Sequence, residues 1–542
     1  MAAKIKKQDG VDPLEKLREK VKGLNLHFKL KEVTENQVMK ILKKLKSKTS
    51  YGIDMISSEV LKMGASVLCA PLTLIINISI LSGKFPTEWK QAKCKPLHKK
   101  GSRKDMNNYR PVSLLSVAGM VLEKVVANQV EEFFESNNLF GSYQFGFRKG
   151  KNTVSELLQL FDSIMEAKDK RREIVLMMYD LSAAFDTISH TTLIDKLKTY
   201  GFDKHAITWM TSYLKDRTQI VNIEGQSSSS QSLPLGTPQG SRISPLLFIC
   251  IMADLDLWTE DCVISNFADD TQTLCVAEEK ETVVAKTTRE ATNVMNFFSA
   301  NDLVNNAGKA CVIYNTKGQG DNLILEDVGG VKLTSLKENE SEKLLGLQIS
   351  REFNWKIHVD MLAVELKKKI GLMRRIRNRL TRGKMLMVAE SIFNSKVRYG
   401  IALYLNPTFE TEDVKARKLS VEASKLQVIQ NSMLRTIFNY RLLDKVNMEK
   451  LRNNIKMFSI NQMNIYHVLL EAFNVINNGS AETIQEKWMP GTEKHYSNRR
   501  EFDVKVPYVD HVRCQGFTWF GPSCGIVSLM KLKQSRTRRL LR

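Results

Sequence analysis

Two short acidic strings carry the residues best suited to chemistry. Asp180 stands in one string, Tyr-Asp-Leu-Ser-Ala-Ala-Phe-Asp, and Asp269 and Asp270 end the other, Phe-Ala-Asp-Asp. Each string follows an apolar run that predicts a strand, at residues 174–178 and 262–264, and residues 271–276 predict a returning strand. Three carboxylates at neighbouring strand tips can hold two Mg²⁺ ions about 4 Å apart, with Mn²⁺ as the alternative cation. This geometry stabilises the attacking and leaving oxygens of phosphoryl transfer and predicts nucleotidyl-transfer chemistry; surface acids at two hairpin tips are the alternative.

The overall charge points to a polyanionic partner. The chain has 542 residues with 81 Lys and Arg against 59 Asp and Glu, a net charge of +22. Its length predicts about two to four domains or subdomains, and its 43% hydrophobic content is ample for folded cores. Neutralising phosphates releases counterions, so nucleic acid is the natural partner. Charge alone leaves the choice open, because many basic proteins bind no nucleic acid.

The remaining bulk features concern the compartment. The eight cysteines show no C-x-x-C pair and no His at zinc-ligand spacing, which favours reduced thiols in an intracellular protein. The first residues have no signal-peptide core, and no uninterrupted apolar run of membrane length is expected. The basic tail at 531–542 is typical of a nuclear address, a nucleic-acid arm or a plain solvated terminus. We therefore expect an intracellular, most simply nuclear, protein without a membrane partner.

A basic amphipathic helix is predicted between Asp360 and Leu380. Its apolar residues recur at gaps of three and four, and its other faces carry bases. Such a helix can lie along a nucleic-acid backbone, or present an ordinary solvated face. The bases that we assign to nucleic-acid binding are Lys367, Lys368, Arg374, Arg375 and Arg377.

In order along the chain, the motifs resemble those of the reverse transcriptase of non-LTR (LINE-type) retrotransposons. The resemblance runs from residue 41 to about residue 462. It rests on the two acidic strings and on residues 50–54, 95–102, 108–115, 144–148, 238–241 with 244–248, and 345–347 with Trp355 and His358. Eight motifs in order are far more specific than one Phe-Ala-Asp-Asp tetrapeptide.

The resemblance implies an α+β fold of the right-hand polymerase type, with fingers, a palm with an antiparallel sheet, and a helical thumb. The implied domains are a helical basic N-terminal extension (1–84), fingers and palm (85–315), primer grip and helical thumb (316–445), and a C-terminal extension with a basic tail (446–542). The implied activity is RNA-directed DNA polymerisation, with an RNA template, a DNA primer and dNTPs as partners.

The resemblance also implies residue roles. Asp180, Asp269 and Asp270 would be the metal ligands and catalytic acids, with Asp270 the least certain ligand. Lys99 or Lys100 with Arg110 would bind the triphosphate, for which an Arg fork and a Lys point charge are suited.

Further roles concern the nucleotide and the primer. Phe185 would stack under the sugar and exclude a 2′-hydroxyl, unless it is a core residue, and Gln239 and Gly240 would approach template and nucleotide. Lys309 is a candidate general acid for pyrophosphate departure, although Ala310 departs from the family pattern. Trp355, in the primer-grip region, would contact nucleic acid.

Two expectations concern what the chain lacks and what else it can be. Neither the Lys-rich segment before Lys95 nor the C-terminal pair Cys514 and Cys524 resembles an endonuclease, so we expect a polymerase without the nuclease that supplies a primer. The alternatives are an inactive retrotransposon relic that only binds nucleic acid, and a protein like a group II intron maturase.

Overall fold

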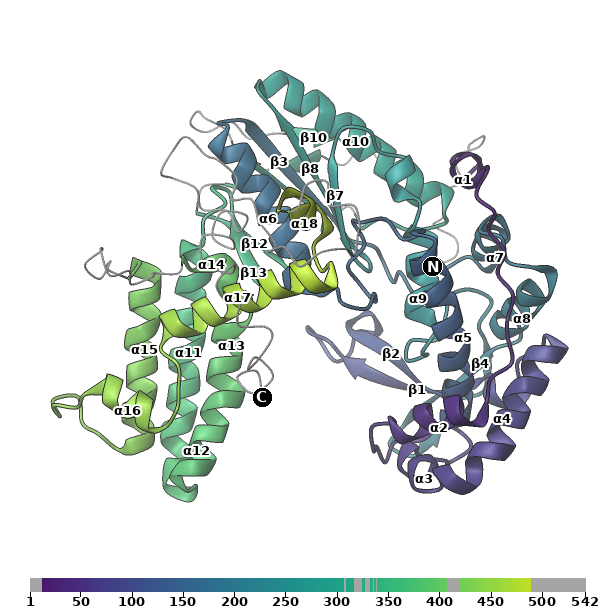
Figure 1. Ribbon diagram of the computed structural model, residues 1–542, viewed down its shortest axis with the longest axis horizontal. Helices are drawn as coiled ribbons and strands as arrows, with labels where there is room; N and C mark the ends of the chain where they lie inside the picture. The colour runs from purple at the N-terminus through teal and green to yellow at the C-terminus, as the bar shows by residue number, and fades with distance from the viewer. Residues whose placement is uncertain are drawn as a thin grey trace, which may run out of the picture.

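The computed structural model is a mixed α+β protein (Figure 1). It describes residues 12–306, 309–315, 324–326, 332–334, 336–337, 339–406 and 419–488. Cys514, Cys524 and the basic tail at 531–542 lie outside these residues. The α-helices are α1 (Glu15–Val21), α2 (Glu35–Lys43), α3 (Ser58–Met63), α4 (Ala65–Ser82), α5 (Val117–Ser136), α6 (Thr153–Asp169), α7 (His190–Thr199), α8 (Lys204–Leu214), α9 (Ser244–Met252), α10 (Lys280–Ala300), α11 (Lys356–Ile376), α12 (Arg382–Ala389), α13 (Ser395–Arg398), α14 (Ile401–Tyr404), α15 (Val421–Phe438), α16 (Met448–Asn454), α17 (Ile460–Asn478) and α18 (Glu482–Trp488).

A four-stranded antiparallel sheet forms the centre of the molecule, in the order β7-β8-β3-β9. Its strands are β7 (Val263–Phe267), β8 (Asp270–Ala277), β3 (Glu173–Tyr179) and β9 (Cys311–Asn315). Along β3, alternate side chains face α10 on one side and α6 on the other, and all are buried. Burial on both faces explains why this strand reads as a continuous apolar run rather than an alternating one.

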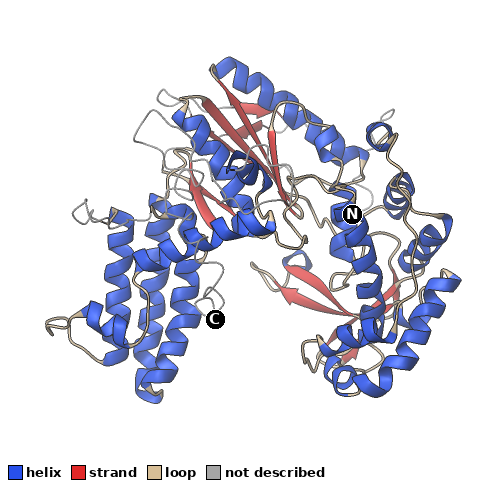
Figure 2. Ribbon diagram, in the orientation of Figure 1, coloured by secondary structure: helices blue, strands red, loops and turns tan. Residues whose placement is uncertain are grey.

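A second sheet lies apart from the first, as Figure 2 shows in red. It has the order β2-β1-β4-β5, with β6 also pairing β4; β1 and β2 are antiparallel, and β1 and β4 are parallel. Its strands are β1 (Gln91–His98), β2 (Tyr109–Leu114), β4 (Thr218–Ile223), β5 (Gln226–Ser227) and β6 (Gln231–Ser232). Two small antiparallel pairs complete the strands: β10 (Ile324–Glu326) with β11 (Lys332–Thr334), and β12 (Ser341–Leu344) with β13 (Leu347–Ser350).

The buried apolar residues form separate cores. The largest runs from Leu17 to Tyr314 and joins α1–α5 to the four-stranded sheet, so the N-terminal helices share one core with the strands. A second core unites α11, α12, α13, α14, α15 and the start of α17 in a helical block, on the left of Figure 1. A third lies between α6, the sheet and the β12-β13 pair.

Two local expectations from the sequence need correction, and helix α4 has an average hydropathy that a pattern of uninterrupted apolar runs does not reveal. The basic composition of residues 89–111 predicts a loop-rich stretch, yet these residues contain β1 and part of β2, because Lys side chains on the less buried face of β1 hide the strand pattern. In the sequence, Ser244 followed by Pro245 predicts a capped helix over 244–258, but Ser244 is the first residue of α9 and makes no cap. By length and composition, helix α4 is long and apolar enough to cross a membrane, with a mean hydropathy of 2.0. Its scattered Ser, Thr and Asn residues interrupt the apolar run but lower the average hydropathy only slightly.

Candidate active site

The three predicted acids lie at one edge of the four-stranded sheet. Asp180 directly follows β3, and Asp270 begins β8. Tyr179 pairs with Thr271 across these strands. Asp180 follows Tyr179 and Asp270 precedes Thr271, so both carboxylates lie at the same end of this strand pair. Phe267 pairs with Asp270, which leaves Ala268 and Asp269 as a two-residue hairpin turn with Ala268 at φ 62°. The register of the sheet thus brings Asp180 and Asp269, which are 89 positions apart in the sequence, to the same edge.

The acidic turn is held from below by the 144–148 segment. The buried Gln144 side chain accepts hydrogen bonds through Oε1 from the backbone N–H of Ala268 at 3.2 Å and of Gly146 at 2.9 Å. A Cβ at position 146 would lie 2.3 Å from the backbone nitrogen of Ala268, so only glycine fits here. This gives the 144–148 motif a physical role: it supports the turn that carries Asp269.

The acids repel one another. Burial and the neighbouring charges of Asp269 and Asp180 raise the pKa of Asp270 to about 6. Burial, with the charge of Asp180, also raises the pKa of Asp269, although Arg110 and Lys309 oppose the shift. Beneath them, burial raises the pKa of Glu156 well above its usual value, and its carboxyl accepts from the Ser265 hydroxyl at 3.0 Å.

Asp180 forms an ion pair with a lysine of the same chain. The Lys309 ammonium lies 2.7 Å from Oδ2 of Asp180, and the Asn306 amide donates to the same oxygen at 3.2 Å. In the part of the chain that the structure describes, no group of three or more His, Cys, Asp or Glu side chains is gathered as ready ligands for one ion. Asp269 and Asp270, whose pKa values are raised by burial and by neighbouring carboxylates, and Asp180, which draws an ammonium, are oxygen ligands of the kind that a divalent cation prefers.

Basic side chains face the acids from the second sheet. Arg110 lies on β2, and Lys99 follows β1 and bonds through its N–H to the Asn108 carbonyl at 2.8 Å. Burial raises the pKa of both Asp269 and Asp186; Arg110 opposes the shift at both carboxyls and Lys99 opposes it at Asp186, so these two basic side chains lie near the acids. Lys100 is exposed on the adjoining turn.

Phe185 and the 234–240 loop form the floor beside the acids. The Phe185 ring is half-buried, with ring centroids 5.1 Å from Phe248 and 6.2 Å from Phe147. Gln239 accepts through its backbone carbonyl from Ser113 N–H at 2.8 Å. Gly240, at φ 128°, has no room for a Cβ, which would lie 2.6 Å from the Ser113 carbonyl oxygen. The close approach that requires this glycine is therefore to strand β2.

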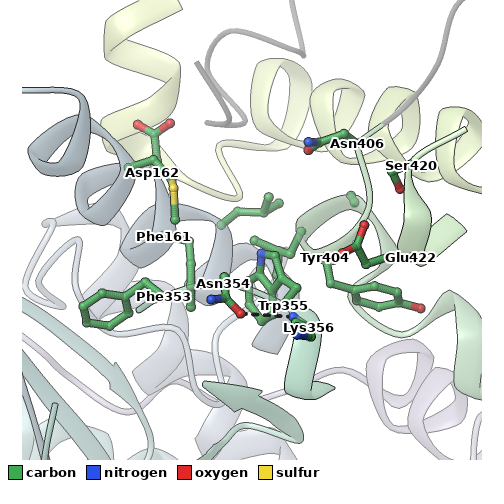
Figure 3. A pocket seen from close by; sticks show the side chains of 14 residues that line it. Phe161, Asp162, Phe353, Asn354, Trp355, Lys356, Tyr404, Asn406, Ser420 and Glu422 are labelled. Atoms are coloured by element: carbon green, nitrogen blue, oxygen red, sulfur yellow. Dashed lines mark hydrogen bonds between the residues drawn. The ribbon is translucent and has the colours of Figure 1, made fainter. Parts of the chain in front are cut away.

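The predicted nucleic-acid contacts after residue 349 lie elsewhere in the molecule. Lys367, Lys368, Arg374 and Arg375 are exposed on α11, and the half-buried Arg377 follows it. Trp355 packs its ring against Phe161 at 4.5 Å between centroids and lines a pocket of about 340 Å³ (Figure 3). Its ring is thus part of the packing between α6 and α11 and is only partly available to a ligand.

Sequence reasoning missed a basic groove next to the site. A groove of about 970 Å³ lies between α2, α5 and β2 and reaches Gly240. The bases that line it are Lys31, Lys40, Lys44, Lys46, Lys48, Lys124 and Arg242, against the acids Glu32 and Glu132. The Lys-rich composition of residues 40–48 is visible in the sequence, but its convergence with Lys124 and Arg242 depends on tertiary packing.

Comparison with known proteins identifies the region that holds the site. Residues 97–349 match the family model for reverse transcriptase (RNA-dependent DNA polymerase). The RNA-directed DNA polymerase from mobile element jockey of Drosophila melanogaster is 27% identical over 391 residues, which cover 69% of this chain and 42% of that protein. The probable RNA-directed DNA polymerase from transposon BS of Drosophila melanogaster is 31% identical over 233 residues, 43% of this chain and 26% of that protein.

A further relative extends the match along the chain. The jockey polymerase of Drosophila funebris is 25% identical over 423 residues, which cover 75% of this chain and 44% of that protein. The chain thus spans less than half the length of these curated relatives. Apo telomerase from Candida tropicalis aligns with 78% of this chain and 72% of its own at 11% identity and a TM-score of 0.39, a likeness too weak to carry an argument.

The matched region includes the acids, Lys99, Arg110, Phe185, Gln239 and Lys309. Residues 97–349 of this chain thus match the reverse transcriptase family, and the chain is related to the polymerases of non-LTR retrotransposons such as jockey and BS.

Proposed function

We propose that this chain is an RNA-directed DNA polymerase that extends a DNA primer on an RNA template. The observation that carries the proposal is the meeting of Asp180, Asp269 and Asp270 at one sheet edge, facing Lys99 and Arg110 from another sheet. An acidic edge opposed by bases suits a triphosphate bound through cations. The membership of residues 97–349 in the reverse transcriptase family supports the same reaction.

In this proposal the molecule is a right hand. The β7-β8-β3-β9 sheet with α6 and α10 is the palm, the β1-β2-β4 sheet with α5 belongs to the fingers, and the α11–α15 block is the thumb. Residues 1–84 are the helical extension, and residues 446–542 follow the thumb. The shared core of α1–α5 and the palm sheet implies that the extension folds together with the palm.

Each site residue then has a task. Asp180, Asp269 and Asp270 would hold two Mg²⁺ or Mn²⁺ ions, which stabilise charge on the attacking and leaving oxygens when bound. Lys99 and Arg110 would bind the triphosphate, with Lys100 at the edge. Phe185 would lie under the deoxyribose. Lys309, released from Asp180 once a cation is bound there, would give its proton to the departing pyrophosphate.

The nucleic acid would lie along the basic side chains of the protein. The 970 Å³ groove continues from Gly240 along α2 and α5, and its Lys-rich lining suits a phosphate backbone rather than particular bases. The exposed bases of α11 would bind the backbone of the template–primer duplex on the other side of the site. A nuclear site of action is part of the proposal, supported by the net charge of +22 and the basic residues at 531–542.

Primer extension tests the proposal. The full chain should incorporate dTTP on poly(rA)/oligo(dT) with Mg²⁺, and Asp180→Asn should abolish incorporation while template–primer affinity stays within about threefold, since a single neutralised acid removes no phosphate contact. Asp261→Asn, which removes an acid at the far end of β7 that pairs with Arg289, is the matched control and should incorporate normally. Normal duplex binding without incorporation by the wild type would instead mark an inactive relic.

A further inference from the structure

The segment after Asp180 is bound to the 234–240 loop along its length. The backbone N–H of Thr237 donates to the Phe185 carbonyl at 2.8 Å, and that of Gly236 donates to the Ile188 carbonyl at 2.8 Å. His190 Nε2 lies 2.8 Å from the Gly236 carbonyl oxygen. A Cβ at position 236 would lie 2.6 Å from the Asp186 carbonyl oxygen, so the two segments are in close contact.

A side-chain contact between Gln239 and Asp186 also joins the two segments. Gln239 donates from Nε2 to both carboxylate oxygens of Asp186, at 2.8 Å each. Burial raises the pKa of Asp186, while the Gln239 amide, Lys99 and Arg110 oppose the shift. Because Ser113 N–H donates to the Gln239 carbonyl at 2.8 Å, the contact links the Phe185 segment to strand β2 as well.

The contact lies next to Phe185, the residue that would exclude a nucleotide with a 2′-hydroxyl. Phe185 precedes Asp186 in the chain, and its ring is confined by Phe248 and Phe147. Those rings limit the side chain from two directions, but the position of the Phe185 backbone depends on the bonds to the 234–240 loop. A misplacement of about 1 Å can change a reaction rate about a hundredfold, so a small shift of this backbone is enough to alter the selection between sugars.

We propose that Asp186 is a positioning residue for sugar selection: its carboxylate holds Gln239, fixes the 234–240 loop against the Phe185 segment, and so keeps the Phe185 ring where a 2′-hydroxyl would collide with it. This inference rests on the proposed function and deepens it. Asp186 does not touch the nucleotide; it acts through Phe185 and Gln239.

The test compares dTTP with UTP incorporation on poly(rA)/oligo(dT). In Asp186→Ala the ratio of kcat/KM for dTTP to that for UTP should fall by about tenfold, the scale of one hydrogen bond to a charged group. Asp186→Asn keeps one acceptor for the Gln239 amide and should fall less. Gln239→Leu removes the donor and should lose selectivity as Asp186→Ala does. Asp195→Ala, which removes an acid on α7 that pairs with Lys198 at 2.8 Å, is the control and should keep the wild-type ratio.

Combination with Phe185→Val separates positioning from a general disturbance. If Asp186 acts through the ring, Asp186→Ala should change the ratio little once the ring is gone, because the two effects share one route. Wild-type selectivity in Asp186→Ala, or an undiminished further loss in the double variant, would overturn the inference while leaving the polymerase proposal intact. A wild type that incorporates neither nucleotide would refute the proposed function itself.

Discussion

Removal of charge from the acidic edge should stabilise the cation-free protein. The pKa of Asp270 is raised from 3.8 to about 6, so the native state holds a proton more tightly than the unfolded chain between these values. Stability contributed by this group is therefore lost as the pH rises through that window, and at neutral pH the ionised Asp270 costs the native state free energy. A shift of roughly 2 pH units corresponds to about 3 kcal/mol. Although its surroundings are close enough for burial to raise its pKa, the Asp270 side chain still reaches solvent, and solvent screening reduces this to about 1 kcal/mol.

The perturbation is Asp270→Asn, assayed by thermal unfolding of the full chain in EDTA. At pH 7.5 the variant should melt about 1–3 °C above the wild type. Its advantage should shrink as the pH falls through 6 and vanish below about pH 3, where the wild-type group is neutral in both states. Mg²⁺ should reverse the order, since a ligand at a hundredfold excess over its Kd adds about 2.7 kcal/mol to the form that binds it.

The control is Asp261→Asn, which also removes one carboxylate from the β7-β8 hairpin but at its far end, where Arg289 pairs with it. It should gain no stability at any pH. A cation-free Asp270→Asn variant that is less stable than the wild type at pH 7.5 would refute the reasoning, because the acid would then be a stabilising group rather than a frustrated one.

Three other predictions concern Lys309, Gln144 and Arg374. Lys309→Ala should slow single-turnover incorporation by about a hundredfold or more, the low end of the range for a general acid, yet change the free energy of unfolding by less than about 1 kcal/mol, because its pair with Asp180 is exposed; an unchanged rate would remove its role. Gln144→Met should raise the Mg²⁺ concentration for half-maximal incorporation, because the Ala268 turn loses its acceptor, while Gln159→Met, a buried amide that does not touch the turn, should leave it unchanged. Arg374→Ala should lower the slope of log Kd for duplex against log salt by about 0.9, and an unchanged slope would place α11 away from phosphate.

The strands and their acidic tips could be predicted from the sequence. The apolar run at 174–178 and the returning pattern at 271–276 are confirmed as β3 and β8, because burial on the sheet faces imposes a readable pattern. Once the strands are known, the acids at their ends must share an edge. The resemblance to reverse transcriptases is likewise confirmed, since its motifs are local strings of residues.

What depends on packing between distant segments could not be predicted. Nothing in the local sequence pairs Asp186 with Gln239, 53 positions apart, or sets Gln144 under the Ala268 turn. The strand β1 was misread because its exposed Lys residues resemble a solvated loop. The resemblance assigns Trp355 to nucleic-acid contact, yet Phe161 from another helix packs against its ring. Local patterns identify elements, whereas side-chain partners require the fold.

A crystal structure of the chain with template–primer, a non-hydrolysable dNTP and Mn²⁺ tests the central claim most directly. Anomalous scattering should place Mn²⁺ between the carboxylates of Asp180 and Asp269 and the triphosphate, with the Lys309 ammonium moved off Asp180. A complex that is competent for primer extension but holds its cations away from these carboxylates would contradict the assignment of the acidic edge as the catalytic centre.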